Sequence, residues 1–503
     1  MSLTKISYSM IDGAAANVLD FGADPTGATD SSIAFTNAIR SGAKKVIIPN
    51  PDAGKQWLLT NPVNVTALLG IHIECEGSLY IDIPPILVKH TGVAFDCTGS
   101  VDLLFTNVRV EGSAITTPTA GWFLARLSTA ASSGRHRFYN CGSTGKFLTA
   151  PYYNYASEEN NHYSCIFINN QSNGRSILIT EKNVSSLSSS FQTIATGIQS
   201  CTQLIFFGGS FFAQGNGGLQ EEAAFYIEGG GDISLYSAFL YCPYGKSQIY
   251  IDQSSSTTNF VILDGVRFEV SSPLPKYCVY FSNGVSQSPS FWSIRNCRMP
   301  TDVSTGYGVY AEDNTTISNF VIDNNQAASG LGILSYKQIA NSFINYAACV
   351  IEARTSGTTL NTEFIGYKGG VSIPKGSESG NFIVETNGWT AFTSDISGLT
   401  IVGALTISSS YKREGNTITY KIIMSAVTSI TCANGTAIFN AASTTLPGPS
   451  IYDGGLVSVF NNTVGIAIGT GGLRTSSGKT GIYLPAVNVT TDQISIYATA
   501  QVF

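Results

Sequence analysis

The sequence predicts an all-β protein whose central part is a parallel β-helix, and three observations carry this prediction. Ser237, Gly265 and Asn296 occupy equivalent turns of similar segments and lie 28 and 31 residues apart, which is the spacing of a solenoid coil. Charged residues make up only 12% of the chain, against roughly 25% in typical domains, while hydrophobic residues reach 43% and glycines number 51. Helical periodicity is nearly absent.

The first ordered element is expected between Asn17 and Asn50, in the stretch NVLDFGADPTGATDSSIAFTNAIRSGAKKVIIPN. The pattern predicts a strand over Val18 to Phe21, a turn at Asp24-Pro25-Thr26-Gly27, a helix capped by Asp30 or Ser31, and a strand over Lys45 to Pro49. One face of that helix is expected to carry Ile33, Ala34, Ala38 and Ile39.

This stretch resembles the N-terminal signature of the pectate-lyase-like parallel β-helix superfamily, especially its phage tailspike and depolymerase branch. The resemblance implies a right-handed β-helix whose open apolar end is capped by the helix, and a homotrimer. It further implies a virion tail spike whose N-terminus attaches to the phage tail or baseplate and whose partner is a bacterial capsular polysaccharide or O-antigen. Such a protein would be made in the host cytoplasm and act at the bacterial surface.

The coils are expected to run from Val101 to about Arg354, where similar strand and turn segments recur. These segments read LLFTNVRVEG, ISLYSAFLYC, FVILDGVRFEV, FWSIRNCRM and FVIDNNQ. We therefore predict a tail over residues 1–16, an N-terminal cap with the first coils over 17–100, and the substrate-binding β-helix over 101–354.

The pattern changes in the last third of the chain. Residues 355–390 are rich in Thr, Gly and Ser and are expected to form the exit from the β-helix. Residues 391–503 predict alternating strands with a hairpin turn at Glu414-Gly415-Asn416. This part resembles the small β-sandwich modules that end many tail fibres, where they trimerise or bind sugar.

Composition argues against several functional classes. The net charge of −6 and the lack of a basic stripe argue against a nucleic-acid partner. No apolar run approaches the ~20 residues that span a bilayer, and the first residues lack the apolar core of a signal peptide. Ten cysteines without a CxxC pair predict buried free thiols. No metal site and no cofactor are predicted.

One motif recurs half a coil away from these turns and is the strongest candidate site. The triplets are Tyr226-Ile227-Glu228, Tyr250-Ile251-Asp252, Tyr280-Phe281-Ser282 and Tyr310-Ala311-Glu312, with spacings of 24, 30 and 30 residues. Because strand side chains alternate, burying the middle residues places the tyrosines and carboxylates outside. Parallel rows of Tyr and Asp or Glu suit a polysaccharide, and a Tyr ladder in a trimer interface is the structural alternative.

Three carboxylates of these triplets are the predicted catalytic residues. Glycoside hydrolysis needs two carboxylates, ~5–5.5 Å apart for retention or ~6.5–9.5 Å apart for inversion. Coils stack ~4.8 Å apart. Glu228 and Asp252 would lie one coil apart, whereas Asp252 and Glu312 would lie two coils apart. The spacing therefore permits either mechanism.

Two further groups are secondary candidates. The segment PYYNYASEENNHY, with Glu158, Glu159 and His162, is expected to be a loop that overhangs the groove, or an ordinary solvated loop. A column of Arg109 with Glu111, Arg267 with Glu269, and Arg298 recurs in the VRV, VRF and CRM strands. Its arginines could stabilise a uronate, although such alternation of charges is more often a surface ion-pair ladder.

Three functions remain open from the sequence. The first is an endo-acting glycoside hydrolase on capsule or O-antigen, which depends on the carboxylate pair. The second is a polysaccharide lyase, which would depend on Arg, Lys, His or Tyr. The third is a receptor-binding spike without catalysis, which would depend on aromatic contacts with Tyr226, Tyr250, Tyr280 and Tyr310.

Overall fold

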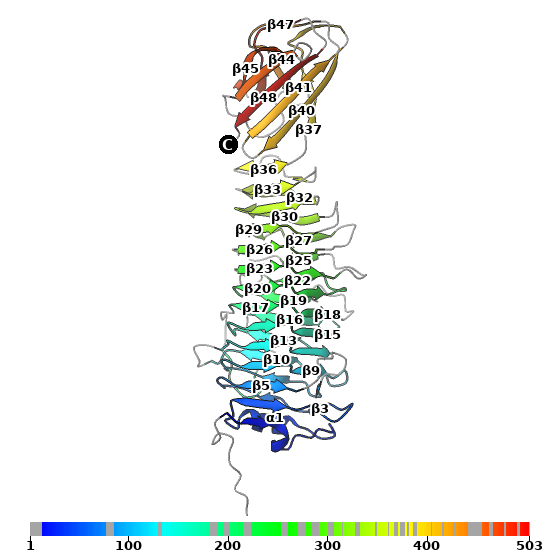
Figure 1. Cartoon of the computed structure of the whole chain (residues 1–503), viewed down its shortest axis with the longest axis vertical. Coiled ribbons are helices and arrows are strands. Elements are labelled where there is room, and N and C mark those ends of the chain that lie inside the picture. Colours follow the sequence, from blue (N-terminus) through cyan, green and yellow to red (C-terminus); the bar gives the residue numbers. More distant parts are fainter. Residues whose placement is uncertain are drawn as a thin grey trace, which may run out of the picture. The chain divides into compact units, whose positions relative to one another are not determined.

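The chain is a β-solenoid followed by an antiparallel β domain (Figure 1). The computed structural model describes residues 13–76, 85–128, 133–172, 174–181, 189–195, 202–214, 223–252, 260–269, 277–282, 291–299, 306–313, 315–326, 332–347, 350–360, 362–366, 371–372, 378–379, 382–385, 390–403, 405–414, 417–425, 429–440, 455–461, 466–476, 479–489 and 493–501. Two compact units are present: Met1–Ser342 with Cys349–Thr358, and Phe343–Ala348 with Thr359–Phe503. Within the described residues, no helix has the length and apolar character that crossing a bilayer requires.

The coils of the first unit contribute strands to three parallel sheets, of which sheet B is the shortest and ends at β24. Sheet A contains β1 (Ala15–Asn17), β2 (Lys45–Ile48), β5 (His72–Cys75), β8 (Leu104–Thr106), β11 (Arg137–Tyr139), β14 (Asn161–Tyr163), β17 (Leu204–Phe207), β20 (Ile233–Tyr236), β23 (Phe260–Asp264), β26 (Phe291–Arg295) and β29 (Phe320–Asp323). Sheet B contains β3 (Trp57–Leu59), β6 (Ile86–Val88), β9 (Arg109–Gly112), β12 (Gly142–Gly145), β15 (Ile166–Asn169), β18 (Ser210–Ala213), β21 (Phe239–Tyr241) and β24 (Arg267–Phe268).

Sheet C completes the coils and carries the longest strands. It contains β4 (Val63–Asn64), β7 (Val93–Asp96), β10 (Ala120–Ala125), β13 (Ala150–Tyr155), β16 (Arg175–Thr180), β19 (Ala223–Glu228), β22 (Ser247–Ile251), β25 (Tyr277–Phe281), β27 (Tyr307–Ala311), β30 (Gly332–Ala340) and β28 (Thr316–Ser318), which pairs with β30. The strand β32 (Val350–Leu360) follows in the same sheet.

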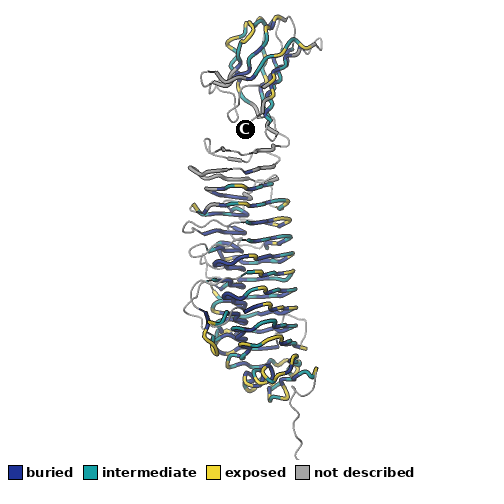
Figure 2. The backbone as a smooth tube through the Cα atoms, turned by 90° about the vertical axis from the view of Figure 1, so that its left-hand side faces the viewer, coloured by how far each residue is buried: buried dark blue, intermediate teal, exposed yellow. Residues whose placement is uncertain are grey.

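The interior is built from columns of like residues, because parallel in-register strands place equivalent side chains one above another. Inside sheet A, the rings of Phe105, Phe138, His162 and Phe206 stack with centroid separations of 5.1, 4.6 and 4.5 Å. Figure 2 shows buried positions running through successive coils. The core is therefore continuous along the coils.

The corner between sheets A and B has a left-handed residue in successive coils from Asn107 to Asn324. Ser237 and Asn296 have φ of 52° and 55°, and Gly265 has φ of 66°, which confirms the predicted equivalence of these turns. Asn and Gly tolerate this conformation better than other residues. The turn chemistry of the sequence thus sets the coil boundaries.

The N-terminal cap differs from the prediction in two places. Val18–Phe21 forms a 3-10 helix, η2, instead of a strand, because the Asn17 side chain accepts a hydrogen bond from the Leu19 amide and Gly22 ends the turn at φ 89°. The helix α1 (Ser32–Ile39) buries Phe35, whereas Ile33 is 69% exposed.

The other expectations for the cap agree with the structure. Ser31, one of the two predicted capping residues, is the N-cap of α1 but makes no side-chain capping bond, while the Asp30 carboxylate accepts a hydrogen bond from the Ser32 amide at 3.1 Å. The amide of Gly27 donates to the Asp24 carbonyl and closes the expected turn, and β2 (Lys45–Ile48) is the expected strand. Seven of the eight described cysteines are buried, and all eight carry free thiols.

The second unit begins with parallel strands and continues as an antiparallel sandwich. Strands β31 (Phe343–Ala347), β33 (Glu363–Gly366) and β36 (Phe382–Glu385) pair in parallel, and β34 (Val371–Ser372) and β35 (Glu378–Ser379) are two-residue strands. Ordered strands therefore replace much of the irregular exit expected over residues 355–390.

The sandwich has a nine-stranded and a three-stranded antiparallel sheet around one core. The nine strands are β37 (Thr390–Phe392), β40 (Thr406–Glu414), β41 (Thr417–Ser425), β48 (Gln493–Gln501), β44 (Gly455–Asn461), β45 (Ile466–Ser476), β46 (Lys479–Tyr483), β43 (Ala437–Asn440) and β38 (Ser394–Asp395). The three are β39 (Thr400–Val402), β42 (Ser429–Cys432) and β47 (Val487–Val489). Glu414 pairs with Thr417, which confirms the predicted hairpin.

Candidate functional site

The four predicted triplets lie in adjacent coils of sheet C, in the register that their spacing implies. Tyr226, Tyr250, Tyr280 and Tyr310 pair directly across β19, β22, β25 and β27. Their ring centroids are 5.1, 5.3 and 5.5 Å apart along the column, with nearly parallel planes. The tyrosines therefore form one continuous stack.

The middle residues of the triplets point into the solenoid, as predicted. Ile227, Ile251, Phe281 and Ala311 are at most 1% exposed and pair in the same register. Because successive side chains of a strand alternate, the tyrosines and the carboxylates lie on the outer face of sheet C.

The expectation that this tyrosine column is exposed is wrong. Tyr226, Tyr250 and Tyr280 are only 5%, 9% and 1% exposed. The rings cover one another, the Arg175 guanidinium lies 3.7 Å from the Tyr226 ring centre, and the Lys246 ammonium lies 3.6 Å from that of Tyr280. A sugar ring therefore cannot lie flat on these rings in the way that the sequence suggested.

A returning segment covers the part of sheet C nearer the N-terminus, and we call residues 189–195 the strap. The Asp96 carboxylate accepts hydrogen bonds from the Ser189 hydroxyl at 2.7 Å and the Ser190 amide at 2.8 Å. Ile194 packs into the outer aromatic cluster, which also contains Tyr153. The outer face of sheet C thus has a hydrophobic layer of its own.

The three predicted catalytic carboxylates and Ser282 occupy one outer position of four successive coils. Glu228, Asp252, Ser282 and Glu312 each follow the inward residue of their triplet. Glu228 is 9% exposed and accepts a hydrogen bond from the Thr180 hydroxyl at 2.8 Å. We call these residues the carboxylate column.

Asp252 is surrounded by hydroxyl donors. The Tyr226 hydroxyl donates to Asp252 at 2.9 Å, and the Ser282 hydroxyl lies 3.4 Å from its other carboxylate oxygen. Burial and the Asp252 charge raise the pKa of Tyr226 well above its ordinary value. The Tyr226 hydroxyl is therefore protonated at neutral pH and acts as a hydrogen-bond donor.

Lys246 is a site residue that the sequence analysis missed. Its ammonium forms a salt bridge with the Glu312 carboxylate at 3.3 Å and donates to the Tyr280 hydroxyl. Lys246 precedes β22 by one residue and Glu312 follows β27, so 66 residues separate the pair in the chain. The local pattern of GKSQIYI gives no signal for this contact.

The segment PYYNYASEENNHY is not an overhanging loop, because it forms β13, a coil corner and β14. His162 lies inside the solenoid, 1% exposed, stacked between Phe138 and Phe206, where burial lowers its pKa to about 3. Tyr152 and Tyr153 point to opposite faces of sheet C, and both are buried because both faces are covered here. The sequence therefore lacks the alternation of polar and apolar residues by which a strand is usually recognised. His162 therefore does not reach the surface position expected for a substrate-binding residue.

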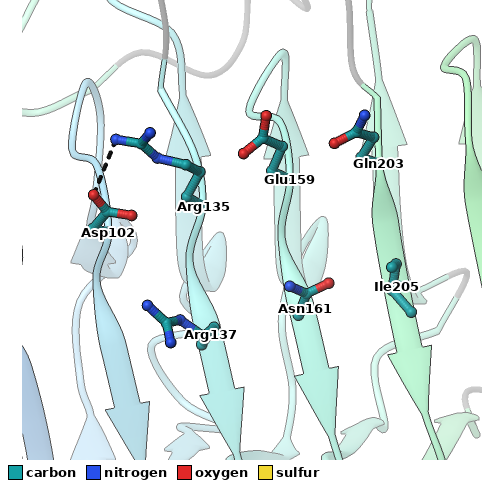
Figure 3. A pocket seen from close by; sticks show the side chains of 7 residues that line it. All are labelled: Asp102, Arg135, Arg137, Glu159, Asn161, Gln203 and Ile205. Carbon is teal, nitrogen blue, oxygen red and sulfur yellow. Dashed lines mark hydrogen bonds and ion pairs between the residues drawn. The ribbon is translucent and has the colours of Figure 1, made fainter.

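The two glutamates of this segment occupy the corner. Glu158 is half-buried, while Glu159 is exposed and has a left-handed backbone with φ of 55°. Glu159 lines a pocket of about 280 Å³ on the outer face of sheet A (Figure 3). The lining residues are Asp102, Arg135, Arg137, Glu159, Asn161, Gln203 and Ile205.

An aromatic column beside this pocket was also missed from the sequence. Tyr139, Tyr163, Phe207 and Tyr236 stack on the outer face of sheet A with centroid separations of 4.5, 5.3 and 5.0 Å. Each stands directly before the left-handed corner residue of its coil. Extending the turn alignment of Ser237 to earlier coils would have found it.

The predicted arginines are on sheet B. Arg267 and Arg298 are exposed and face each other in adjacent coils, and Arg267 lies 5.4 Å from the Phe239 ring centre. Arg109 of the same pattern is buried, 7% exposed. These residues are therefore on a different face from both the carboxylate column and the pocket.

The comparisons with known proteins concern structure alone, since no protein-family profile and no curated protein sequence matches the chain. The chain is similar to phage tailspikes. One is a variant of the tailspike protein of E. coli bacteriophage HK620 in complex with a pentasaccharide, with a TM-score of 0.44, 10% identity, and coverage of 97% of this chain and 94% of that chain. Another is a tailspike of Acinetobacter baumannii bacteriophage Fri1, a capsular polysaccharide depolymerase, with a TM-score of 0.39, 8% identity and coverage of 98% and 87%.

A third similar structure is DFA-IIIase from Arthrobacter chlorophenolicus, with a TM-score of 0.43, 11% identity, and coverage of 72% of this chain and 93% of that chain. At these identities the similarity concerns the path of the backbone. The chemistry depends on the side chains of this chain.

Proposed function

We propose that this protein recognises a bacterial surface polysaccharide, a capsule or O-antigen, and cleaves it internally by hydrolysis. The observation that carries the proposal is the carboxylate column, which holds three acidic side chains at one outer position of neighbouring coils. Hydrolysis of a glycosidic bond requires two carboxylates at a defined separation, and the coil repeat supplies such separations.

Glu228 and Asp252 form the pair whose environments differ most. Glu228 is buried and Asp252 receives hydrogen bonds from Tyr226 and Ser282. Donors around Asp252 stabilise its negative charge, which suits a nucleophile, and Glu228 is then the candidate general acid of the pair. Coils lie ~4.8 Å apart, close to the ~5–5.5 Å of retaining enzymes.

Glu312 supports an inverting alternative on the same column. It is two coils from Asp252, and its carboxylate forms an ion pair with the Lys246 ammonium, which makes it the candidate general base of an inverting pair. The configuration of the new reducing end, read by proton NMR during the first minutes of reaction, separates retention from inversion.

A lyase is the second candidate, and the exposed Arg267 and Arg298 are the observation that favours it. A lyase also needs a base next to the uronate. Tyr226 donates its hydroxyl proton in a hydrogen bond to Asp252 and His162 is enclosed in the core, so neither is placed to act as that base. A lyase would leave an unsaturated uronate that absorbs in the ultraviolet, whereas a hydrolase would not.

The biological setting belongs to the proposal as well. We propose a homotrimeric tail spike on the virion, attached to the phage tail through its N-terminus, with a C-terminal sandwich that trimerises or binds sugar. The N-terminal signature supports this setting. A spike that only binds its receptor would show the same oligomer without product formation.

The test removes each carboxylate without changing its shape. Asp252→Asn and Glu228→Gln should lower the rate of polysaccharide cleavage by ~10²–10⁴-fold or more, with binding retained. Glu74→Gln is the matched control, because Glu74 pairs with Lys45 on sheet A, away from the column. Wild-type rates in both column variants would overturn the proposed catalytic pair.

A further inference from the structure

The outer face of sheet A has a corner column that the fold alone does not explain. Asp102, Arg135, Glu159, Gln203 and Asp232 are equivalent residues of successive coils, two positions before the paired strand residues, and all have φ of 55–57°. Asp is enriched in this backbone region, whereas long side chains such as those of Arg135, Glu159 and Gln203 seldom adopt it. The opposite corner of the same sheet uses Asn107, Asn140, Ser164, Gly208, Ser237 and Gly265.

This contrast indicates that the side chains of the charged corner have a role beyond turn formation. Non-glycine residues in the left-handed region cost free energy, and such residues concentrate at functional sites. Four of the five, all but Asp232, line or form the pocket of about 280 Å³ described above. The strained positions and the pocket are thus the same part of the surface.

The charges within the pocket are partly satisfied by one another. Asp102 and Arg135 form a salt bridge at 3.0 Å, shown as the dashed line in Figure 3. Within the described part of the chain, Arg137 forms no ion pair, and its exposed guanidinium stands on the strand next to Asn161. The pocket therefore offers a cation whose charge is not compensated by a direct partner.

Hydrogen-bonding groups and an aromatic edge surround this cation. Asn161 and Gln203 supply amides, and Glu159 supplies a carboxylate that accepts from hydroxyl groups. Two residues beyond Arg137 on the same strand and face, Tyr139 is 36% exposed, and Phe207 is 40% exposed two coils further on. A planar cation, amides and aromatic edges together suit a sugar residue that carries a carboxylate.

We propose that this pocket is a second, non-catalytic polysaccharide site that binds a carboxylated sugar residue, with Arg137 holding the carboxylate. That the ligand is a bacterial polysaccharide rests on the function proposed above. The location of this second site and its preference for a carboxylated sugar are new. Asn161, Gln203 and Glu159 bind hydroxyls of the same sugar residue or of the next one. The polysaccharide then runs along the aromatic column, whose rings repeat once per coil. The carboxylate column lies on sheet C, so the two sites are separate surfaces.

The test compares an acid with its neutral counterpart. Uronate-containing capsular polysaccharides are cut to short oligosaccharides, and each is also prepared in carboxyl-reduced form. Affinities for both forms are measured by isothermal titration calorimetry in the Asp252→Asn background. Arg137→Gln keeps hydrogen-bonding capacity but removes the charge. Arg295→Gln is the matched control, an exposed arginine on the same sheet five strands further along.

The expected result is a preference of about tenfold or more for an acidic form, on the scale of one hydrogen bond to a charged group, which Arg137→Gln abolishes and Arg295→Gln retains. If no acidic form is preferred, or if Arg137→Gln keeps the preference, the acidic-sugar site is wrong. Cleavage is assayed separately in the wild type. If the wild type cleaves nothing but prefers the acidic oligosaccharide, and Arg137→Gln loses that preference, the binding site is supported and only the proposed hydrolase activity is overturned.

Discussion

At the scale of single residues, the tyrosines of sheet C stabilise the outer layer of the solenoid. Tyr250 is 9% exposed and contacts rings on both sides, 5.1 Å from Tyr226 and 5.3 Å from Tyr280. A buried ring of this kind contributes through packing and area removed from water. Its role in sugar contact, if present, is limited to its edge and hydroxyl.

The first prediction concerns this packing. Tyr250→Ala should destabilise the folded protein by ~3–5 kcal/mol, as large-to-small changes of buried rings do, and speed its unfolding in guanidinium. Tyr244→Ala, at a 43% exposed tyrosine, should have little effect. Equal unfolding rates for Tyr250→Ala and the wild type would show that the stack does not stabilise the fold.

The second prediction concerns the buried histidines. Burial lowers the pKa of His136 and of His162 to about 3, against 6.5 for the free side chain. The unfolded chain therefore binds more protons than the folded one below pH 6.5, and stability falls as the pH falls from 6.5 towards 3. Below about pH 3, under the pKa of the folded and of the unfolded state, the stability that the neutral histidines contribute is fully lost.

His162→Phe tests this linkage, because a phenyl ring continues the stack of Phe138 and Phe206. Relative to the wild type, the variant should gain up to about 3 kcal/mol on going from pH 7 to pH 4.5. Guanidinium unfolding at both pH values measures it. A pH-independent difference between the two proteins would contradict the account.

At the scale of elements, the strap and the coil register determine what the outer face of sheet C looks like. The register followed from the spacing of the Tyr triplets, because parallel strands repeat equivalent positions in every coil. Burial of the triplets did not follow, since Arg175 and Lys246 reach the tyrosine rings from other parts of the chain. The alternation of side chains along one strand does not predict which distant residues will cover it.

The same limitation explains the two misassigned segments. Val18–Phe21 has strand-like residues, but a side-chain cap and a glycine turn it into a 3-10 helix. The stretch around Tyr152 and Tyr153 has polar tyrosines on both faces, so it read as a loop although both faces are covered. The pocket of Arg137 and Glu159 could not be foreseen, because its residues become neighbours only when coils stack.

The third prediction tests the strap. Asp96→Ala removes the carboxylate that receives the Ser189 hydroxyl and the Ser190 amide, and leaves those donors without their partner. The strap should open, at a cost of ~1–3 kcal/mol, and hydrogen exchange over residues 189–195 should become faster. The coils on either side should keep their protection. Unchanged exchange of the strap would show that Asp96 does not anchor it.

At the scale of the whole molecule, the trimer remains a prediction. The sequence also led us to expect exposed apolar residues on the coils, such as Phe211, Phe212 and Phe239, that would favour a trimer. Phe211 is instead fully buried, and the Phe212 and Phe239 rings pack against each other with centroids 5.6 Å apart. Light scattering should nevertheless give three times the 53.3 kDa of one chain, and a mass of one chain at micromolar concentration would exclude the trimer.

The central claim is that this solenoid hydrolyses a bacterial polysaccharide at its carboxylate column. Capsules from a panel of strains are incubated with the wild type and with Asp252→Asn, and the product ends are identified by mass spectrometry. The account predicts oligosaccharides that have gained one water per cleaved bond, formed by the wild type and not by the variant. Products that end in an unsaturated uronate and have gained no water would contradict it, as would equal product formation by the two proteins.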